Sequence, residues 1–422
     1  MKKLMTLILV VCLLLTTQLE ACKANPTSSW WSTNWSIRRE VALTTANENN
    51  QNDYAVLLHV NYDSEMRTDF GDIRFTYCDE SLGSEKETHY WIQEKSDGIF
   101  ANVWVKVPLV KASSTTILYM YYKNPSATTA SNGTNTFWFF DDFDNDNYTS
   151  DGWAAWNSWG SGGQWTESGT VIQQVGGTTG DAILSHSIPE ISNYEMQVKA
   201  KPEQWTEDAV FVGTGDYTTG SGTGQEMAVG INWNYLGVTG RYWGITNTTG
   251  EGGPIAAWAY VEAPISLDEW YTFRLVANGT AYGWVSNSTG EYFVGSPKGA
   301  SPSINGVHFK ANPMQRYASY DWVVVRKYSY PEPAYTIGSP ETPTSEAPFW
   351  TRWWFWTIIA LVAIVVVLAF TTFRYCKKPS ISKETGAMQS KMAQKASKIC
   401  PKCGANLPAD SKFCGKCGTS LE

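Results

Sequence analysis

The stretch YEMQVKA at residues 194–200 decides the fold class of this chain. Its apolar and polar side chains alternate with a period of two, which is typical of a half-buried β-strand. The stretches YTFRL at 271–275 and VWVKV at 103–107 repeat the pattern. Clusters of Gly, Asn, Ser and Thr separate these stretches, and no long helical period occurs between residues 30 and 338. The sequence therefore predicts an all-β region built from two β-sandwich or jelly-roll domains.

Changes in composition divide the chain into segments. Residues 124–136 are polar and turn-rich, and they separate a first β domain at 30–124 from a second at 137–338. Residues 339–350 carry Pro, Thr, Ser and Glu, which predicts a short stiff stalk. Residues 377–398 are polar and basic, and they predict a linker to the C-terminal cysteines.

Two apolar segments predict targeting to a membrane. Residues 1–22 begin with two lysines and an apolar run, as a secretory signal does. Cleavage, lipidation of Cys22 and an uncleaved anchor all remain open. Residues 353–373 carry no charge and predict one transmembrane α-helix, with a buried soluble helix as the alternative. Tryptophans before it and basic residues after it predict an extracellular N-terminal ectodomain, a cytoplasmic C-terminus and localisation in the cell membrane.

The placement of charges and cysteines limits which partners the body can bind and how it is stabilised. The formal net charge is −8, with the acidic excess in the ectodomain and a basic tail after residue 374. An acidic body does not favour binding of nucleic acid. Cys78 is the one cysteine well inside the body, so we expect core packing to hold the body together without a disulfide framework.

Motifs in the first domain resemble a known family. They comprise Trp35 with Arg38, the stretch DIRF at 72–75, Trp91, the stretch VWVKVP at 103–108 and the stretch LYMYYKN at 118–124. Together they resemble the domain of unknown function 2341, found in surface proteins of archaea and bacteria, and Lys123 stands where that family often has Gly. The resemblance implies no known chemistry. In DIRF, Asp72 and Arg74 share one strand face, and we interpret them as a structural ion pair.

Residues 137–338 resemble a concanavalin A-like or laminin G-like jelly roll. The similar features are the stretch DDF at 141–143, Trp165, the stretch WYTFRL at 270–275 and the stretch DWVVVRKY at 321–328. The resemblance implies a β-sandwich only, because this fold serves lectins, glycosidases and inert spacers alike.

The sequence gives little support to catalysis. Glycosidases need a pair of carboxylates, and relatives with this fold often carry them as Glu-x-Asp-x-Glu on one strand. No Glu-x-Asp occurs here, although a pair from separate strands, such as Glu195 with Glu207, stays open. We therefore predict that the protein is not an enzyme.

Asp142, Asp144 and Asp146 recur at two-residue spacing and could hold Ca²⁺ through their carboxylate oxygens. The glycine expected at the sixth loop position is replaced by Asn147, and a solvated acidic turn is the alternative reading.

Three tryptophans suggest a binding surface for sugars. Trp153, Trp156 and Trp159 repeat every three residues in a segment rich in Gly, Ser and Asn, a spacing that fits neither strand nor helix. They could form an exposed platform against which sugar rings stack, or they could belong to the core.

Four cysteines near the C-terminus predict a metal centre. Cys400 with Cys403 and Cys414 with Cys417 form two Cys-x-x-Cys knuckles, which together hold one structural Zn²⁺ through four thiolates. The segment 399–422 resembles the short zinc ribbons of many prokaryotic proteins. Redox dithiols are the alternative, but no βαβ context accompanies them.

The sequence predicts a membrane-anchored surface protein for adhesion or for recognition of a glycan or protein ligand. The alternatives are an extracellular glycoside hydrolase and a structural envelope component whose ribbon binds an unknown cytoplasmic partner. Six sequons predict possible glycosylation, at Asn34, Asn132, Asn147, Asn247, Asn278 and Asn287.

Overall fold

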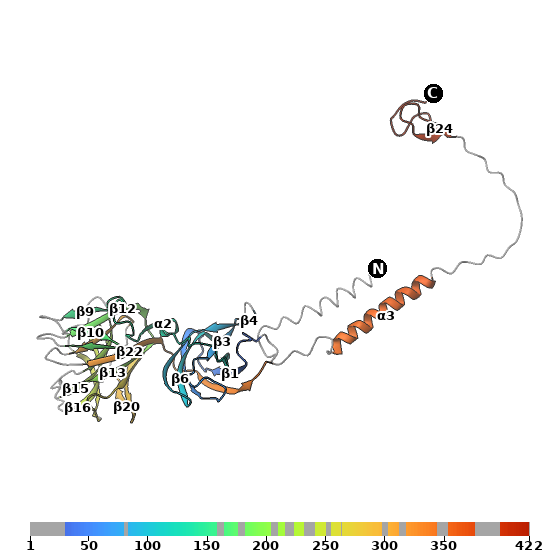
Figure 1. Ribbon diagram of the computed structural model, residues 1–422. Helices are drawn as coiled ribbons and strands as arrows, with labels where there is room; N and C mark the ends of the chain where they lie inside the picture. Colours follow the sequence, from blue (N-terminus) through green and yellow to red (C-terminus); the bar gives the residue numbers. More distant parts are fainter. Residues whose placement is uncertain are drawn as a thin grey trace. The chain divides into compact units, whose positions relative to one another are not determined.

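The computed structural model describes most of the chain (Figure 1). The described residues are 30–79, 83–157, 164–175, 182–203, 210–215, 223–231, 241–249, 255–262, 264–297, 303–311, 318–343, 353–375 and 397–421. The predicted signal peptide at 1–22 and almost all of the predicted linker at 377–398 lie outside these ranges. The chain divides into two compact units, residues 1–345 and 346–422.

The first β-sandwich packs a five-stranded sheet against a three-stranded sheet. The larger sheet has the order β23-β1-β7-β3-β4, and the smaller has the order β2-β6-β5. Their bounds are β1 Ile37–Thr44, β2 Gln51–Asn61, β3 Arg74–Asp79, β4 Ser84–Thr88, β5 Tyr90–Ser96, β6 Phe100–Val110, β7 Thr115–Tyr122 and β23 Ala334–Glu341. Alternate residues such as Val103, Val105 and Val107 point into one core, as the period of two predicts.

The second β-sandwich consists of two larger antiparallel sheets. One has the order β10-β11-β22-β13-β18-β19-β20, with β8 also paired to β22, and the other has the order β17-β16-β15-β14-β21-β12-β9. The bounds are β8 Phe139–Asp141, β9 Ala154–Asn157, β10 Trp165–Ser168, β11 Val171–Gln174, β12 Ala182–Ile191, β13 Tyr194–Pro202, β14 Val210–Gly215, β15 Thr223–Ile231, β16 Arg241–Thr249, β17 Ile255–Val261, β18 Tyr271–Asn278, β19 Thr280–Asn287, β20 Gly290–Gly295, β21 Ile304–Ala311 and β22 Ala318–Lys327. The predicted β-sandwich fold is therefore confirmed.

The second sandwich is inserted in the chain of the first. After β22 the chain returns, and β23 pairs antiparallel with β1, for example Val41 with Ile337 and Thr44 with Ala334. The predicted boundary between the second domain and the stalk, at residue 338, falls inside this strand. Residues 339–341 are thus part of a sheet, because the backbone of β1 offers them a partner that the local sequence does not reveal.

Aromatic side chains join the two sandwiches. Trp91 and Trp104 of the first sandwich pack with Phe137 and with Trp322 of β22, and all four are at most 7% exposed. Phe137 follows the short helix α2 (Gly133–Thr136), whose N-terminus is capped by the side chain of Asn132. A shared apolar cluster of this kind indicates that the two sandwiches form one body rather than two domains on a flexible linker.

Asp72 and Arg74 are buried, but they do not pair with each other as predicted. The carboxylate of Asp72 accepts hydrogen bonds from the backbone N–H groups of Arg67, Lys123 and Asn124. Arg74 instead pairs with Glu87 at 3.3 Å. Asp72 therefore fixes the loops that precede β3 and follow β7, and Arg74 links β3 to β4. Cys78 on β3 is disulfide-bonded, so one disulfide adds to the core packing that the sequence predicts.

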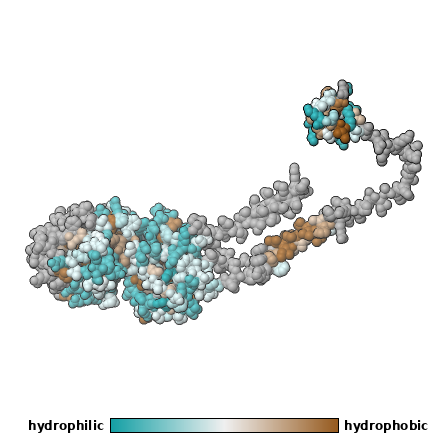
Figure 2. Space-filling view, turned by 45° about the horizontal axis from the view of Figure 1, so that its top comes forward, coloured by the Kyte–Doolittle hydropathy of each residue, from teal (hydrophilic) through white to brown (hydrophobic). Residues whose placement is uncertain are grey.

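The second unit contains the helix α3 (Trp353–Tyr375), with exposed apolar side chains that are brown in Figure 2. Among the described residues, no helix combines the length and the apolarity needed to cross a membrane. This finding contradicts the predicted transmembrane helix at 353–373 and the predicted cell-membrane localisation that depended on it.

The same unit ends in a small metal-binding fold. Its strands β24 (Ser397–Ile399) and β25 (Asn406–Pro408) pair antiparallel, with Lys398 opposite Leu407. A single bridge between Phe413 and Ser420 closes the second half. The apolar content of this segment is low, so its fold depends on the cysteines described below.

Candidate functional site

An open cleft lies where the two sandwiches meet, with a volume of about 610 Å³. The first sandwich contributes the loop that leads into β2, and the second contributes the end of β12, the end of β18 and the segment after β22. The lining residues are Asn47, Asn49, Gln51, Trp138, Glu190, Ile191, Ser192, Asn193, Asn278, Lys327, Tyr328, Ser329 and Tyr330. The cleft therefore combines aromatic rings with side-chain amides and hydroxyls.

The aromatic residues of the cleft differ in how firmly they are held. Trp138 is half-buried, its indole N–H donates to the backbone oxygen of Pro189 at 2.9 Å, and the ammonium of Lys327 lies 5.0 Å from its ring centre. The Lys327 ammonium also donates to the backbone oxygen of Asn52, which ties the two sandwiches together beside the cleft. Tyr330, in contrast, is 75% exposed. One ring is thus fixed in a wall of the cleft, and the other is free to contact a ligand.

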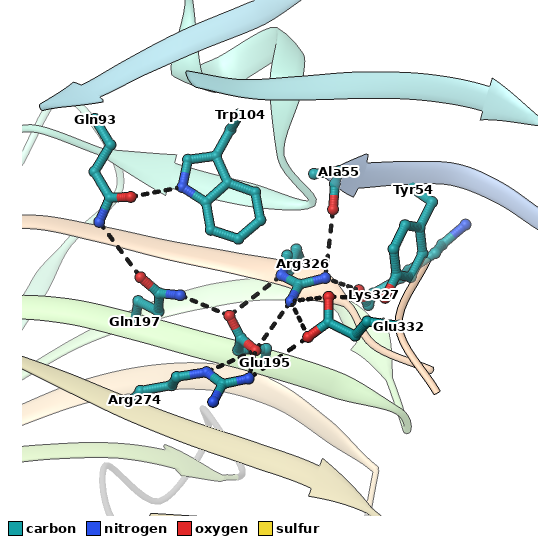
Figure 3. A network of polar contacts seen from close by, with 10 residues as sticks. All are labelled: Tyr54, Ala55, Gln93, Trp104, Glu195, Gln197, Arg274, Arg326, Lys327 and Glu332. Carbon is teal, nitrogen blue, oxygen red and sulfur yellow. Dashed lines mark hydrogen bonds and ion pairs between the residues drawn. The ribbon is translucent and has the colours of Figure 1, made fainter. Parts of the chain in front are cut away.

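A buried network of charges anchors the Lys327–Tyr330 wall (Figure 3). Arg326 directly precedes the wall segment, and its guanidinium donates to Glu195 at 3.0 Å. The same guanidinium donates at 2.8 Å to Glu332, which follows the segment, so the two ends of the segment are linked. Glu195 also accepts from Arg274 at 2.8 Å. The side chains of Glu195 and Arg326 are 1% and 3% exposed. This pairing holds the wall in place, because each buried charge has a partner of opposite sign.

The network reaches across the junction. Arg326 donates to the backbone oxygen of Ala55 on β2 at 3.3 Å, and its guanidinium lies 4.8 Å from the ring centre of Trp104. The side chain of Gln93 on β5 accepts from the Trp104 indole N–H at 2.9 Å and lies at hydrogen-bond distance from Gln197 on β13. Figure 3 shows these contacts converging from both sandwiches. The wall of the cleft is therefore fixed relative to both.

Glu195 is held ionised within a buried network of ion pairs. Burial alone would raise the pKa of its carboxyl group, but Arg326 and Arg274 outweigh burial and hold the pKa below its ordinary value. A carboxylate that is buried and ionised in this way is unsuited to donate a proton to a leaving group. Glu207, the other member of the pair considered from the sequence, lies outside the described residues.

The predicted tryptophan platform does not form at Trp153. This residue is 3% exposed, its indole N–H donates to Asp141 at 2.7 Å, and its ring stacks on Phe309 at 5.1 Å. Trp156 lies in β9, where its side chain is not described, and Trp159 lies outside the described residues. Trp153 precedes β9 and enters the core from a turn, rather than standing exposed as a platform requires.

We expect Trp153→Ala to lower the free energy of unfolding by about 3–5 kcal/mol, because it removes a large buried ring and leaves a cavity. The buried carboxyl of Asp141 would also lose its indole donor. Thermal and urea melts of the full chain would measure the loss. A variant as stable as the parent would show that the ring is not part of the core.

The three aspartates suggested for Ca²⁺ do not form a metal cluster. Asp142 is half-buried, whereas Asp144 and Asp146 are exposed, and Asp146 accepts from the backbone N–H of Gly169 at 2.8 Å. Within the described residues, the one group of three or more Cys, His, Asp or Glu ligands close enough for a shared ion is the cysteine cluster. Burial, together with the neighbouring carboxylates of Asp144 and Asp141, raises the pKa of Asp142 to about 6.

The sequons lie mostly on the surface. Those at Asn34, Asn132, Asn147 and Asn278 are exposed. Asn287 is half-buried and donates to Glu269 at 2.8 Å, and the side chain of Asn247, on β16, is not described. Glycosylation at these positions stays a prediction.

The structure brings the four C-terminal cysteines together. All four sulfur atoms lie within 4.8 Å of one another, with Cys400 and Cys417 at 3.7 Å and Cys403 and Cys414 at 3.5 Å. Tetrahedral zinc with Zn–S bonds of about 2.3 Å requires sulfur atoms about 3.8 Å apart, so the cluster fits the ion.

The two knuckles repeat one backbone geometry. Gly404 donates to the oxygen of Cys400 at 2.9 Å, and Gly418 donates to that of Cys414 at 2.8 Å. Both glycines have a φ near +70°, a conformation that side chains rarely adopt, which explains the residue type at these positions. Four protein ligands would leave no open position on the metal, so its role would be structural.

Comparison with known proteins supports the resemblances inferred from the sequence. Residues 69–158 match the family described as domain of unknown function (DUF2341), and residues 399–421 match the zinc-ribbon domain. The first match extends from the first sandwich into β9, so it includes much of the aromatic junction. No curated protein matches the chain.

Several solved structures align with part of the chain at low similarity. A legume lectin-like domain from Entamoeba histolytica has 6% identity and a TM-score of 0.33, over 43% of this chain and 92% of that one. The exoplasmic/lumenal domain of VIP36 with Ca²⁺ and Man3GlcNAc has 9% identity and a TM-score of 0.33, over 46% and 98%. The carbohydrate binding module CBM66 from Bacillus subtilis has 13% identity and a TM-score of 0.29, over 44% and 96%. Scores this low carry no inference about what this chain binds.

The sequence matches and the folds agree on the organisation of the chain. The motifs of the first sandwich fall in and around the matched segment, and the paired cysteine knuckles form the second match. The chain thus contains a segment at 69–158 that is similar to the domain of unknown function (DUF2341), a second β-sandwich inserted between β7 and β23 of the first, and a C-terminal segment that is similar to the zinc-ribbon domain.

Proposed function

We propose that the junction cleft binds a neutral carbohydrate without catalysing its conversion. The observation that carries the proposal is the pairing of an exposed ring, Tyr330, with amide side chains of Asn49 and Asn193 around one open cleft. The C–H face of a sugar packs against an aromatic ring, while its hydroxyls bond to amides that both donate and accept. A cleft of this size and lining suits a small polar ligand.

The charges around the cleft favour a neutral ligand over an anionic one. Lys327 is the cationic residue of the lining, and its ammonium already bonds to the backbone of Asn52 and lies over the ring of Trp138. Glu190 brings a negative charge to the same lining and accepts from Ser303 at 2.6 Å. A phosphate or carboxylate ligand would therefore meet one engaged cation and one anion.

The lining also supports binding without hydrolysis. Hydrolysis of a glycosidic bond requires two carboxyl groups on either side of the bond. Among the described residues that line the cleft, Glu190 is the one carboxylate. Glu195 lies beneath the wall in its ion pairs and has no access to a ligand in the cleft.

Tyr330→Ala should weaken glycan binding about tenfold while the melting temperature stays within a degree or two, because the removed ring is exposed and contributes little to the core. Tyr330→Phe keeps the ring and should keep most of the affinity. Binding would be measured with the full chain, first on an array of neutral oligosaccharides and then by calorimetry.

Ile99→Ala serves as the matched control, since Ile99 is 64% exposed in a turn of the first sandwich that does not line the cleft. Equal binding by the parent and Tyr330→Ala, or no binding of any array member by the parent at millimolar concentration, would refute the proposed function.

A further inference from the structure

We infer that the bound carbohydrate is a chain of several sugars, and that it continues from the cleft across an aromatic strip formed by Tyr282, Trp284 and Phe293. This inference rests on the proposed function of the cleft. It adds the class of ligand, a linear neutral oligosaccharide or polysaccharide, and a second binding surface outside the cleft.

The strip lies on the outer face of the sheet that contains β22, β13, β18, β19 and β20. Directly paired residues on neighbouring strands share a face. Arg274 pairs with Trp284, and Trp284 pairs with Phe293, so these side chains form one row across three strands. Tyr282 lies two residues from Trp284 and therefore on the same face. The opposite face, with Phe273 and its neighbours, lies in the core.

The rings of the strip are close together and open to solvent. The ring centres of Tyr282 and Trp284 are 6.1 Å apart, and those of Trp284 and Phe293 are 5.3 Å apart. Tyr282 is 37% exposed and Phe293 is 52% exposed, with Trp284 half-buried between them. Consecutive rings at this spacing can each stack under one sugar of a chain. Neighbouring large aromatic side chains that remain exposed in this way indicate a binding surface.

Arg274 fixes the middle of the strip. Its guanidinium lies 4.8 Å from the ring centre of Trp284, and it is held from the other side by Glu195 at 2.8 Å. The same buried network that anchors the cleft wall therefore also orients the central ring. A pre-oriented ring loses little conformational entropy when a sugar stacks on it.

The strip and the cleft are continuous through Asn278. This residue lines the cleft and is paired with Thr280, whose hydroxyl lies 3.1 Å from the hydroxyl of Tyr282. Both Asn278 and Tyr282 lie on the outer face of the sheet, since Val276 is two residues from the first and pairs with the second. A ligand that leaves the cleft beside Asn278 would thus meet the three rings in the order Tyr282, Trp284 and Phe293.

The first sandwich covers the part of this face that β22 and β13 form. The outer side chains of β22 and β13, such as Arg326 and Gln197, face the first sandwich. The exposed rings lie farther along the same sheet, on β19 and β20. Its polar neighbours Asn278 and Thr280 can bond to sugar hydroxyls, which favours a glycan chain over a wholly apolar partner.

The test measures affinity against chain length. The full chain would be titrated by calorimetry with β-linked oligosaccharides of glucose, xylose, mannose and N-acetylglucosamine, each series from the disaccharide to the hexasaccharide. In the series that binds, affinity should rise with length. Trp284→Ala should weaken the hexasaccharide at least about tenfold and leave the disaccharide nearly unchanged. Tyr330→Ala in the cleft should weaken both, and Ile99→Ala neither.

The outcomes separate this inference from the proposed function. If the disaccharide binds but longer chains bind no more tightly, or if Trp284→Ala affects all lengths equally, the strip is refuted while the cleft stands. If no series binds to the parent, both proposals fail. Phe293→Ala removes a more exposed ring, so it tests the strip even if the Trp284→Ala variant does not fold. Its affinity should depend on ligand length in a similar way. An unchanged hexasaccharide affinity in a folded Phe293→Ala variant would contradict the predicted order of rings.

Discussion

Removal of zinc should unfold residues 397–421 while the two β-sandwiches stay folded. The ribbon has only two short strands and few buried apolar side chains, whereas its four sulfur atoms already lie at the spacing that zinc requires. Metal binding to such sites supplies about 10–16 kcal/mol of apparent free energy at neutral pH, far more than the small core can. The sandwiches have cores of their own and should not depend on the metal.

Purified full chain should contain one zinc per molecule by elemental analysis. A strong chelator should release the zinc, make the ribbon sensitive to protease and leave the near-ultraviolet circular dichroism of the sandwiches unchanged. Cys403→Ser and Cys414→Ser should reproduce the effect of the chelator. Lys416→Ala is the matched control, because Lys416 lies between two ligand positions without belonging to the cluster. A metal-free chain whose ribbon remains protected from protease would overturn the assignment.

Replacement of Arg326 by alanine should lower the free energy of unfolding of the body by about 3–5 kcal/mol, because it leaves the buried carboxylate of Glu195 with one cation fewer. The change also removes the bond to the Ala55 backbone and the contact with the Trp104 ring, both of which cross the junction. Urea denaturation followed by tryptophan fluorescence would measure the loss. Lys95→Ala, which breaks an exposed ion pair with Asp97, should cost about 0–1 kcal/mol. Equal effects of the two substitutions would contradict a structural role for the network.

The network should also make the stability of the body depend on pH. The arginines hold the folded-state pKa of Glu195 below its ordinary value, so this carboxylate contributes stability above the ordinary pKa of glutamate. That contribution is lost as pH falls through the lower folded-state value. In the Arg326→Ala variant the acid-dependent part of the loss should be smaller, which a denaturation series from neutral to acidic pH would show.

Local patterns predicted the strands well because they depend on period alone. The alternation in 194–200 and 271–275 appears as β13 and β18, with the apolar set buried. The knuckles were predicted for a similar reason, since the spacing of Cys400, Cys403, Cys414 and Cys417 determines that their sulfur atoms can meet. Neither inference needed information about distant parts of the chain.

Predictions about exposure were less successful. The irregular spacing of Trp153 suggests an exposed platform, yet this residue enters the core from a turn and its indole N–H donates to Asp141. The alternation of β19 places Tyr282 and Trp284 on one face, but only the register of β19 against β20 places Phe293 beside Trp284. Arg38 also has an environment that its local sequence does not reveal. It belongs to the family motif, is 2% exposed, and pairs with Glu85, forty-seven positions away.

The sequence by itself determined the elements that follow from period and short-range spacing: the β-strands, the two sandwiches as a fold class and the cysteine ribbon. The tertiary structure alone decided that β23 returns to pair with β1, that the sandwiches share an aromatic junction, and that Arg326, Glu195 and Glu332 lie beneath a cleft. The physical reason is that strand pairing and charge burial depend on partners hundreds of residues apart. A local pattern specifies which face of a strand is apolar, but it does not specify which distant strand or charge will cover that face.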